Sequence, residues 1–181
     1  MDMLKGLRII SKTLGSLLLA FVIAVALLLG GVRLIGLTPY TVLSGSMEPT
    51  YPVGSVIYVT ETDPAELEVG EAITFRLPSG TVVTHGIEAI LGENPQNRTF
   101  LTKGEANETA DGEPVPAAAV IGKPVFALPY LGYLSEFIRQ PVGLITLGGI
   151  CLATLILTFG VDAILEKIEE KQKRENQSEI F

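Results

Sequence analysis

Three short segments of the sequence carry the residue types that nucleophilic catalysis uses. Ser44–Thr50 holds two serines around a glycine, and Val83–Ile87 holds His85, the only histidine of the chain. Leu101–Gly112 is rich in acidic residues and includes Asp111. A serine hydroxyl is a weak nucleophile until a base removes its proton, and that base works best when a carboxylate orients it. The set therefore points to nucleophilic hydrolysis, although each segment alone fits a polar turn, a structural histidine or a solvated loop.

In chain order the segments read Ser-Gly-Ser-Met-x-Pro, a histidine within a β-like run, and Thr-Lys-Gly-acid-x-Asn with an aspartate six residues after the acid. This combination resembles the type I signal peptidases of the archaeal and endoplasmic-reticulum branch, from the first apolar run to about Phe126. The resemblance implies a small, mainly β catalytic domain flanked by two transmembrane helices. It also implies a membrane-bound serine endopeptidase that removes N-terminal signal peptides from secreted preproteins after small residues, on the outer membrane face.

The resemblance assigns roles to individual residues. It implies that Ser46 is the nucleophile and that His85 is the general base, at the place where the bacterial branch carries a lysine. Asp111 matches the third catalytic residue, and Glu105 matches a second, supporting acid. We expect Glu105 to hold its loop by pairing with Lys103 or Arg98. The hydroxyl of Ser44 and the backbone N–H of Ser46 match the oxyanion hole.

The sequence departs from the family pattern at two positions and leaves two alternatives open. The family usually has aspartate in place of Glu105 and arginine in place of Gly86. One alternative is a Ser/Lys mechanism with Lys103 as the base. The other is a non-catalytic, membrane-anchored β module that binds partners in secretion; a His85 ring far from Ser46 would favour it.

The family binds its substrate as an extended strand beside a sheet edge, with small side chains at the first and third positions before the cut. Backbone pairing of this kind gives affinity, and shallow pockets give the side-chain preference. Tyr40, Val42 and residues 73–75 are the residues we expect to line those pockets. The expected partners are preproteins with signal peptides and the lipid bilayer.

Two uncharged apolar runs predict transmembrane helices. Thr13–Val32 contains twenty residues and Gln140–Val161 contains twenty-two, and about twenty residues cross a bilayer as a helix. The alternative for the first run is a cleavable signal peptide with a small-x-small site at Ala24–Ala26, but the apolar sequence continues well past that point.

The cationic residues predict the orientation of these helices. Three basic residues lie between positions 5 and 12 and four between positions 167 and 174, whereas Arg33 and Arg139 flank the middle segment. By the positive-inside bias, both termini are expected in the cytoplasm. The predicted organisation is residues 1–37 as N-terminus and first transmembrane helix, 38–140 as the external β catalytic domain, 141–165 as the second transmembrane helix, and 166–181 as a cytoplasmic charged tail.

Short apolar runs broken by glycine and proline predict a β structure between the helices. Val, Ile, Thr, Tyr and Phe recur at strand length in these runs, and residues 78–80 form a turn signal. The predicted strands cover residues 55–60, 72–77, 81–83 with 87–91, 99–102 and 120–126.

Charge and composition exclude several other functions. The net charge of −7 argues against a nucleic-acid surface, which needs a basic stripe to neutralise phosphates. One histidine and one cysteine cannot form a His/Cys zinc site, an internal disulfide or a dithiol motif. No metal and no organic cofactor is expected.

Asn97 and Asn107 match the N-glycosylation pattern, and Asn97 is the better candidate because a sugar on Asn107 would crowd Asp111.

Overall fold

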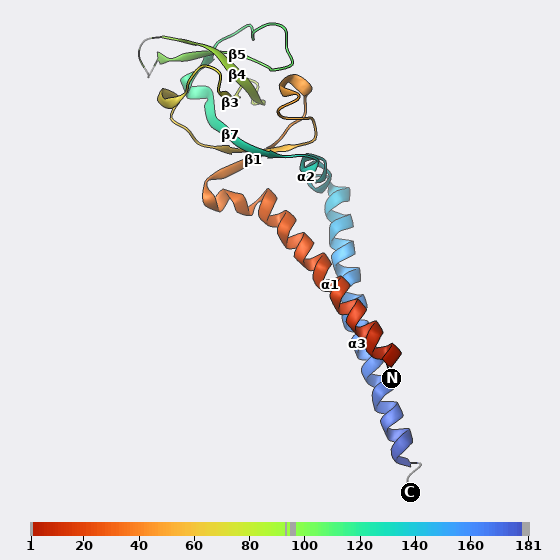
Figure 1. The fold of residues 1–181 in the computed structure, drawn as a ribbon. Helices are drawn as coiled ribbons and strands as arrows, with labels where there is room; N and C mark the ends of the chain where they lie inside the picture. Colours follow the sequence, from red (N-terminus) through yellow and green to blue (C-terminus); the bar gives the residue numbers. More distant parts are fainter. Residues whose placement is uncertain (1, 93, 95–96, 179–181) are drawn as a thin grey trace. The chain divides into compact units, whose positions relative to one another are not determined.

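The computed structural model describes residues 2–92, 94 and 97–178. The chain divides into two compact units (Figure 1). A β unit extends from Leu28 to Phe137, and a helical unit is formed by the two ends of the chain, up to Leu27 and from Ile138.

The β unit is built on a seven-stranded antiparallel sheet with the order β1-β2-β7-β3-β4-β5-β6. All the predicted runs form strands, so the mainly β prediction is confirmed; β1 and the very short β6 were not predicted. The strands are β1 Leu37–Thr41, β2 Val56–Thr60, β3 Ala72–Arg76, β4 Val82–Leu91, β5 Thr99–Lys103, β6 Val115–Pro116 and β7 Val120–Leu128.

The predicted turn at residues 78–80 joins β3 to β4. The N–H of Gly80 donates to the carbonyl of Leu77 at 2.8 Å, and the N–H of Leu77 donates to the carbonyl of Thr81 at 2.8 Å. This hairpin sets a register in which Ile73 lies opposite His85 and Phe75 lies opposite Val83.

Strand β7 connects the two halves of the sheet. It pairs with β3 through Val120 and Gly122 and with β2 from Lys123 to Leu128. At the crossover Gly122 has a φ of 155°, and a Cβ atom there would lie 1.9 Å from the carbonyl oxygen of Thr60. Only glycine allows the two backbones to come this close.

One hydrophobic cluster of the core packs against β3, β4, β5 and β6, and the consecutive residues Val56–Val59 of β2 are buried as well. The side chains of the cluster come from these four strands and from the loop before β3, because alternate residues of a strand point to the same face. They are Leu67, Ile73, Phe75, Ile87, Phe100 and Val115.

Short helical turns connect the strands. The 3₁₀ turns are η1 Gly31–Ile35, η2 Gly45–Met47, η3 Pro64–Glu66 and η5 Ala117–Ala119. A nine-residue α-helix, α2 (Leu131–Arg139), follows β7 and was not predicted. The N–H of Gly132 in α2 donates to the carbonyl of Gly54 at 2.9 Å, which fixes α2 beside the loop before β2.

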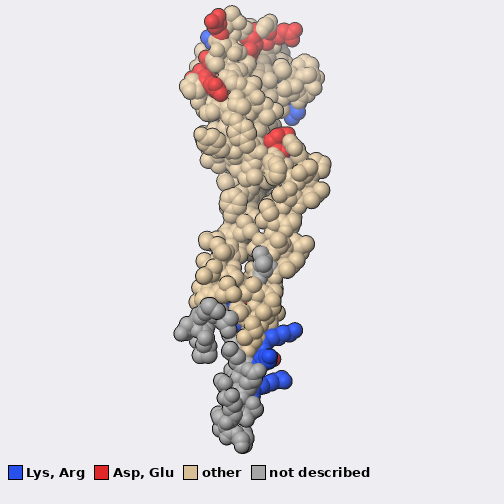
Figure 2. All heavy atoms as spheres, turned by 90° about the vertical axis from the view of Figure 1, so that its right-hand side faces the viewer, with Lys and Arg blue, Asp and Glu red and all other residues tan. Residues whose placement is uncertain are grey.

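The helical unit consists of α1 (Asp2–Leu29) and α3 (Pro141–Ser178). Each contains a span long and apolar enough to cross a membrane, Gly6–Leu29 and Pro141–Ile168. The prediction of two such helices is confirmed. On the face shown in Figure 2, acidic side chains gather on the β unit, whereas lysine and arginine side chains cluster on the helical unit.

An ion-pair cluster joins the two long helices within the helical unit. Asp162 of α3 lies 3.4 Å from Nε of Arg8 and 3.1 Å from Nζ of Lys12, both on α1. Near these residues the helices approach closely, since a Cβ atom on Gly15 would lie 3.9 Å from Cβ of Thr158. A carboxylate beside an apolar span is costly when unpaired, so the cluster stabilises the pairing of α1 with α3.

We predict that Gly15→Cys with Thr158→Cys forms a disulfide in a Cys151→Ser background, because a Cβ separation of 3.9 Å lies in the range that disulfides need. After proteolytic cleavage within the β unit, the two helices should stay joined on a non-reducing gel. Asp162→Asn should slow this cross-linking, whereas the matched control Glu166→Gln should not. Equal cross-linking rates in the double-cysteine protein and in its Asp162→Asn and Glu166→Gln variants would contradict the role of the ion pairs.

Candidate active site

Ser46 lies at the centre of the 3₁₀ turn η2. Ser44 before the turn and Glu48 after it have extended backbones, and the N–H of Glu48 donates to the carbonyl of Gly45 at 3.1 Å. Met47 is 6% exposed and anchors the turn in the protein. A single tight turn between two extended segments therefore presents the half-buried Ser46 side chain.

The loop that follows β5 packs directly on this turn. The N–H of Ala106 donates to the carbonyl of Ser46 at 2.9 Å, and the N–H of Glu105 contacts the sulfur of Met47 at 3.4 Å. A Cβ atom on Gly104 would lie 2.6 Å from the carbonyl oxygen of Ser46. Glycine at this position therefore lets the loop reach the serine.

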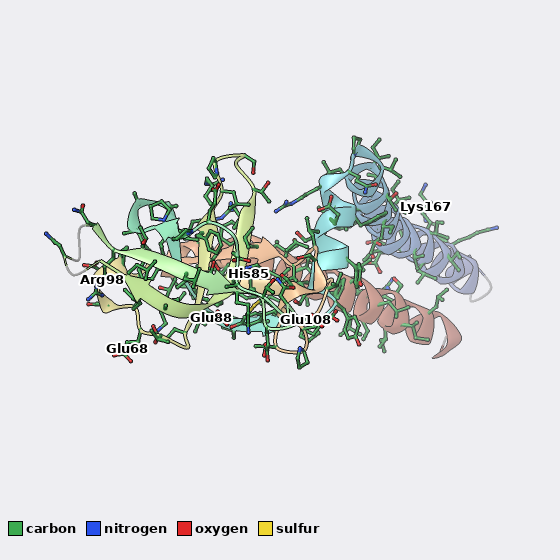
Figure 3. All side chains as sticks on the ribbon, turned by 90° about the horizontal axis from the view of Figure 1, so that it is seen from above. Glu68, His85, Glu88, Arg98, Glu108 and Lys167 are labelled. Carbon is green, nitrogen blue, oxygen red and sulfur yellow. The ribbon has the colours of Figure 1, made fainter. Side chains whose placement is uncertain are left out.

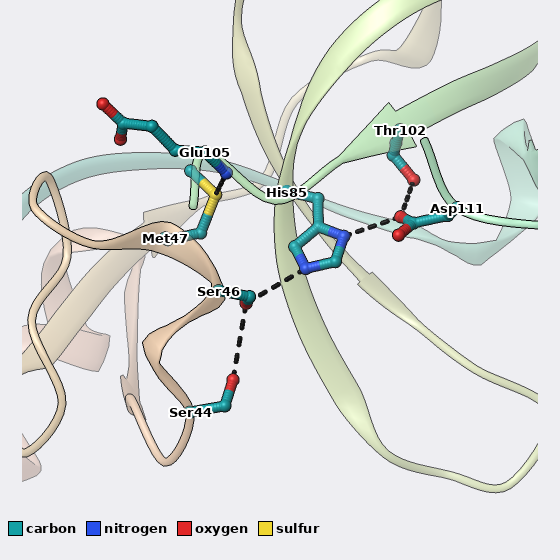
Figure 4. A network of polar contacts seen from close by, with 7 residues as sticks. All are labelled: Ser44, Ser46, Met47, His85, Thr102, Glu105 and Asp111. Atoms are coloured by element: carbon teal, nitrogen blue, oxygen red, sulfur yellow. Dashed lines mark hydrogen bonds and ion pairs between the residues drawn. The ribbon is translucent and has the colours of Figure 1, made fainter. Parts of the chain in front are cut away.

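His85 connects this turn to the loop. It lies on β4, is 8% exposed, and is held edge-on by Phe75, with ring centroids 6.3 Å apart. Figure 3 shows His85 well inside the β unit, with Glu68 and Arg98 at its margin. Nε2 of His85 lies 3.1 Å from Oγ of Ser46, and Nδ1 lies 2.6 Å from Oδ2 of Asp111 (Figure 4).

This chain of contacts fixes the direction of each hydrogen bond. The carboxylate of Asp111 only accepts, so Nδ1 of His85 donates to it, and Nε2 is left as an acceptor for the hydroxyl of Ser46. The distances are those expected between a nucleophile and its base, and between a base and the group that orients it. The arrangement can remove a proton from Ser46.

Ser44 lies next to the serine of this chain. Its Oγ is 3.4 Å from Oγ of Ser46, and its side chain is exposed. Because the proton of Ser46 is directed to His85, the hydroxyl of Ser44 is free to donate towards Ser46. The structure thus places a hydroxyl donor beside the candidate nucleophile.

Glu105 does not join this chain of contacts. Figure 4 shows its side chain directed away from the imidazole of His85. Its carboxylate is near Tyr51, where burial, and secondarily the charge of Glu105, raises the pKa of the phenol. Of the cations that we expected to pair with Glu105, Lys103 instead lies 2.9 Å from Glu88, and Arg98 donates to the carbonyl of Ala65 at 2.9 Å.

Thr102 is a member of the site that sequence reasoning missed. Its Oγ1 donates to Oδ2 of Asp111 at 2.6 Å, and the residue is 0% exposed. One sequence signal for Thr102 was available. It lies two residues after the buried Phe100 on β5, and residues two apart in a strand face the same side.

A strand edge is available beside His85. Strand β4 pairs with β3 from Val82 to Gly86, whereas its pairing with β5 begins at Gly86. Within the described part of the sheet, residues 82–85 therefore have a strand on one side only. Of the residues expected to line substrate pockets, Tyr40 and Val42 are half-buried, whereas Ile73 and Phe75 belong to the core.

The described residues contain no group of three or more His, Cys, Asp or Glu side chains that could hold a metal ion. Asn97 and Asn107, the two candidate glycosylation sites, are both exposed.

A family model described as "Signal peptidase, peptidase S26" matches residues 14–103, a stretch that includes Ser46 and His85 and ends before Asp111. Signal peptidase I W of Bacillus subtilis is 38% identical over 117 residues, which are 60% of this chain and 61% of that protein. The sec11 catalytic subunit of the signal peptidase complex of Neurospora crassa is 28% identical over 108 residues, 55% of this chain and 62% of that protein.

The SEC11C catalytic subunit of the human signal peptidase complex is 28% identical over 102 residues, 52% of this chain and 53% of that protein. The matched region thus spans between 53% and 62% of the length of these relatives. The resemblance to signal peptidase I of the archaeal and endoplasmic-reticulum branch is confirmed.

We predict that Gly104→Ala destabilises the protein, because the new methyl group would meet the Ser46 carbonyl at 2.6 Å. Overpacking of this kind costs about 1–3 kcal/mol. The thermal unfolding midpoint should fall by several degrees. Gly112→Ala is the matched control, since a Cβ there meets nothing within 4 Å. Equal midpoints for the two variants would contradict the close packing of the loop on Ser46.

Proposed function

Because the chain resembles the signal peptidases of peptidase family S26, we propose that it is a membrane-bound serine endopeptidase that removes N-terminal signal peptides from secreted preproteins after small residues. The observation that carries the proposal is the chain of contacts from Ser46 through His85 to Asp111, with separations of 3.1 and 2.6 Å. Homology supports signal-peptide removal as the reaction, and the geometry supports the assignment of the catalytic residues.

In the proposed mechanism, Oγ of Ser46 attacks the carbonyl carbon of the scissile peptide bond while its proton passes to Nε2 of His85. Asp111 accepts the Nδ1 hydrogen bond and stabilises the imidazolium that forms. The tetrahedral intermediate then expels the amine of the mature protein, which takes the proton from His85, and an acyl-enzyme remains. Water, activated by His85 in turn, hydrolyses the ester and frees Ser46.

The oxyanion of the intermediate needs donors placed where its charge develops. We assign this role to the backbone N–H of Ser46 and the hydroxyl of Ser44. The exposed position of Ser44, 3.4 Å from Oγ of Ser46, supports the assignment because the hydroxyl can turn from the serine to the oxyanion.

The substrate is proposed to bind as an extended strand. An extended peptide can pair its backbone with the free edge of β4 at residues 82–85, immediately beside His85. Pairing of this kind recognises the backbone and leaves sequence preference to the side-chain pockets, which agrees with a requirement for small residues only near the cut.

The membrane supplies the remaining recognition. The spans Gly6–Leu29 and Pro141–Ile168 are proposed to cross the bilayer, with both termini in the cytoplasm and the β unit on the outer face. The apolar part of a signal peptide in the same bilayer would then present its cleavage site at the level of the β unit. Anchoring both molecules in one membrane raises their effective concentration.

The geometry also bears on the two alternatives. The 3.1 Å separation of His85 from Ser46 supports an enzyme over a non-catalytic binding module. The ion pair of Lys103 with Glu88 supports His85, rather than Lys103, as the base. A Ser/Lys mechanism predicts that His85→Ala keeps most of its activity.

We predict that Ser46→Ala abolishes cleavage of a purified preprotein by the detergent-solubilised protein, with folding unchanged, since the substitution removes one partly exposed hydroxyl. Ser44→Ala should lower kcat by about a hundredfold to a thousandfold, because one oxyanion donor remains. An active Ser46→Ala protein beside an inactive Ser44→Ala protein would reverse the assignment of the nucleophile.

The two acids are predicted to differ. Asp111→Asn should lower kcat on the order of ten-thousandfold at near-normal stability, because it disturbs the tautomer of His85. Glu105→Gln should keep measurable activity, since its side chain points away from His85, and Glu105→Asp should be tolerated. Turnover and thermal midpoint of the three variants check this. Full activity of Asp111→Asn with an inactive but folded Glu105→Gln would overturn it.

A further inference from the structure

The carboxylate of Asp111 has a second partner besides His85, and both partners bind the same oxygen. Oδ2 accepts from Nδ1 of His85 at 2.6 Å and from Oγ1 of Thr102 at 2.6 Å. A side-chain carboxylate turns easily about its last bond, because that torsion has a broad energy profile. Two donors converging on one oxygen hold the carboxylate in a single orientation.

Thr102 also holds the main chain of Asp111. The N–H of Asp111 donates to the carbonyl of Thr102 at 2.8 Å. Asp111 itself lies outside the strands, in the loop between β5 and β6, whereas Thr102 lies within β5. Thr102 therefore connects a loop residue to the sheet at both the backbone and the side chain.

The sheet register places Thr102 close to His85, on the same face of the sheet. Thr102 lies opposite Ile87, which is two residues after His85 on the same face of β4. Thr102 is fully buried and His85 is 8% exposed. Water therefore does not compete for the hydroxyl, and a buried hydroxyl is costly to leave unpaired.

We infer that Thr102 is a positioning residue of the proposed peptidase: its hydroxyl fixes Oδ2 of Asp111 so that this oxygen accepts the Nδ1 proton of His85. The inference rests on the proposed function. Thr102 keeps its own proton throughout the reaction, and the proton of Ser46 travels only to Nε2 of His85.

The test compares Thr102→Val, which keeps the shape and removes the hydroxyl, with Thr102→Ser, which keeps the hydroxyl. Hydrogen bonds to a charged group correspond to about ten- to hundredfold in rate, so Thr102→Val should lower kcat by about that factor with little change in KM. Thr102→Ser should restore most of the turnover.

Thr74→Val is the matched control. Thr74 is also 0% exposed, lies in a neighbouring part of the sheet, and makes a partly buried side-chain hydrogen bond of 2.8 Å to Thr84. In the described part of the chain, no side-chain hydrogen bond joins Thr74 to Asp111. If Thr102 were merely structural, the two valine variants would lose stability and turnover alike.

A second readout does not depend on activity. Because His85 is the only histidine, ¹⁵N-histidine labelling gives the NMR signals of one imidazole. Thr102→Val should shift the Nδ1–H proton signal, whereas Thr102→Ser and Thr74→Val should leave it near its original position. If Thr102→Val fails to fold, Thr102→Cys, which offers only a weak S–H donor, takes its place in the comparison.

Unchanged His85 signals in Thr102→Val, or an equal loss of kcat in Thr74→Val, would overturn the inference. An active Ser46→Ala protein would instead overturn the proposed function. The His85 spectra would still report whether Thr102 orients Asp111, so the two failures are distinguishable.

Discussion

The candidate site depends on one packing contact, between the loop after β5 and the turn that carries Ser46. The hydrogen bond from Ala106 to the Ser46 carbonyl and the missing Cβ of Gly104 bring the two segments together. The same loop continues to Asp111. The contact that holds Ser46 in place therefore also brings the carboxylate to Nδ1 of His85, opposite the nitrogen that Ser46 contacts. Without it, the distance from Ser46 to the imidazole would not be fixed.

Much of the fold could be predicted from the sequence because its signals are local. The apolar runs of α1 and α3 and the turn at residues 78–80 depend on neighbouring residues alone. Strand β1 was missed because Leu37–Thr41 contains a proline and pairs with β2 alone, and a strand of this kind is defined by its partner. The two-residue β6 and the nine-residue α2 are too short to show a periodic pattern.

The residues of the site also differ in how far the sequence predicts them. Ser46, His85 and Asp111 could be proposed because their residue types and order match a family, but their contacts join segments as far as 39 positions apart. For Thr102, the sequence indicates only that it faces the same side of β5 as Phe100, and its role depends on a partner nine positions away across a loop. The side chain of Glu105 could not be placed either, because its direction depends on how the loop packs on Met47.

The position of His85 on the core face explains how a small domain can hold an aligned base. Its neighbours on that face, Val83 and Ile87, are apolar, and Phe75 contacts its edge. A buried imidazole is stable only when both nitrogens have partners, and here Asp111 and Ser46 supply them. The core thus restrains the ring, the polar partners offset its burial, and the half-buried Ser46 is where the site meets the surface. The core and the site share strand β4. A substitution of Phe75 would therefore change the orientation of the His85 ring before it unfolds the sheet.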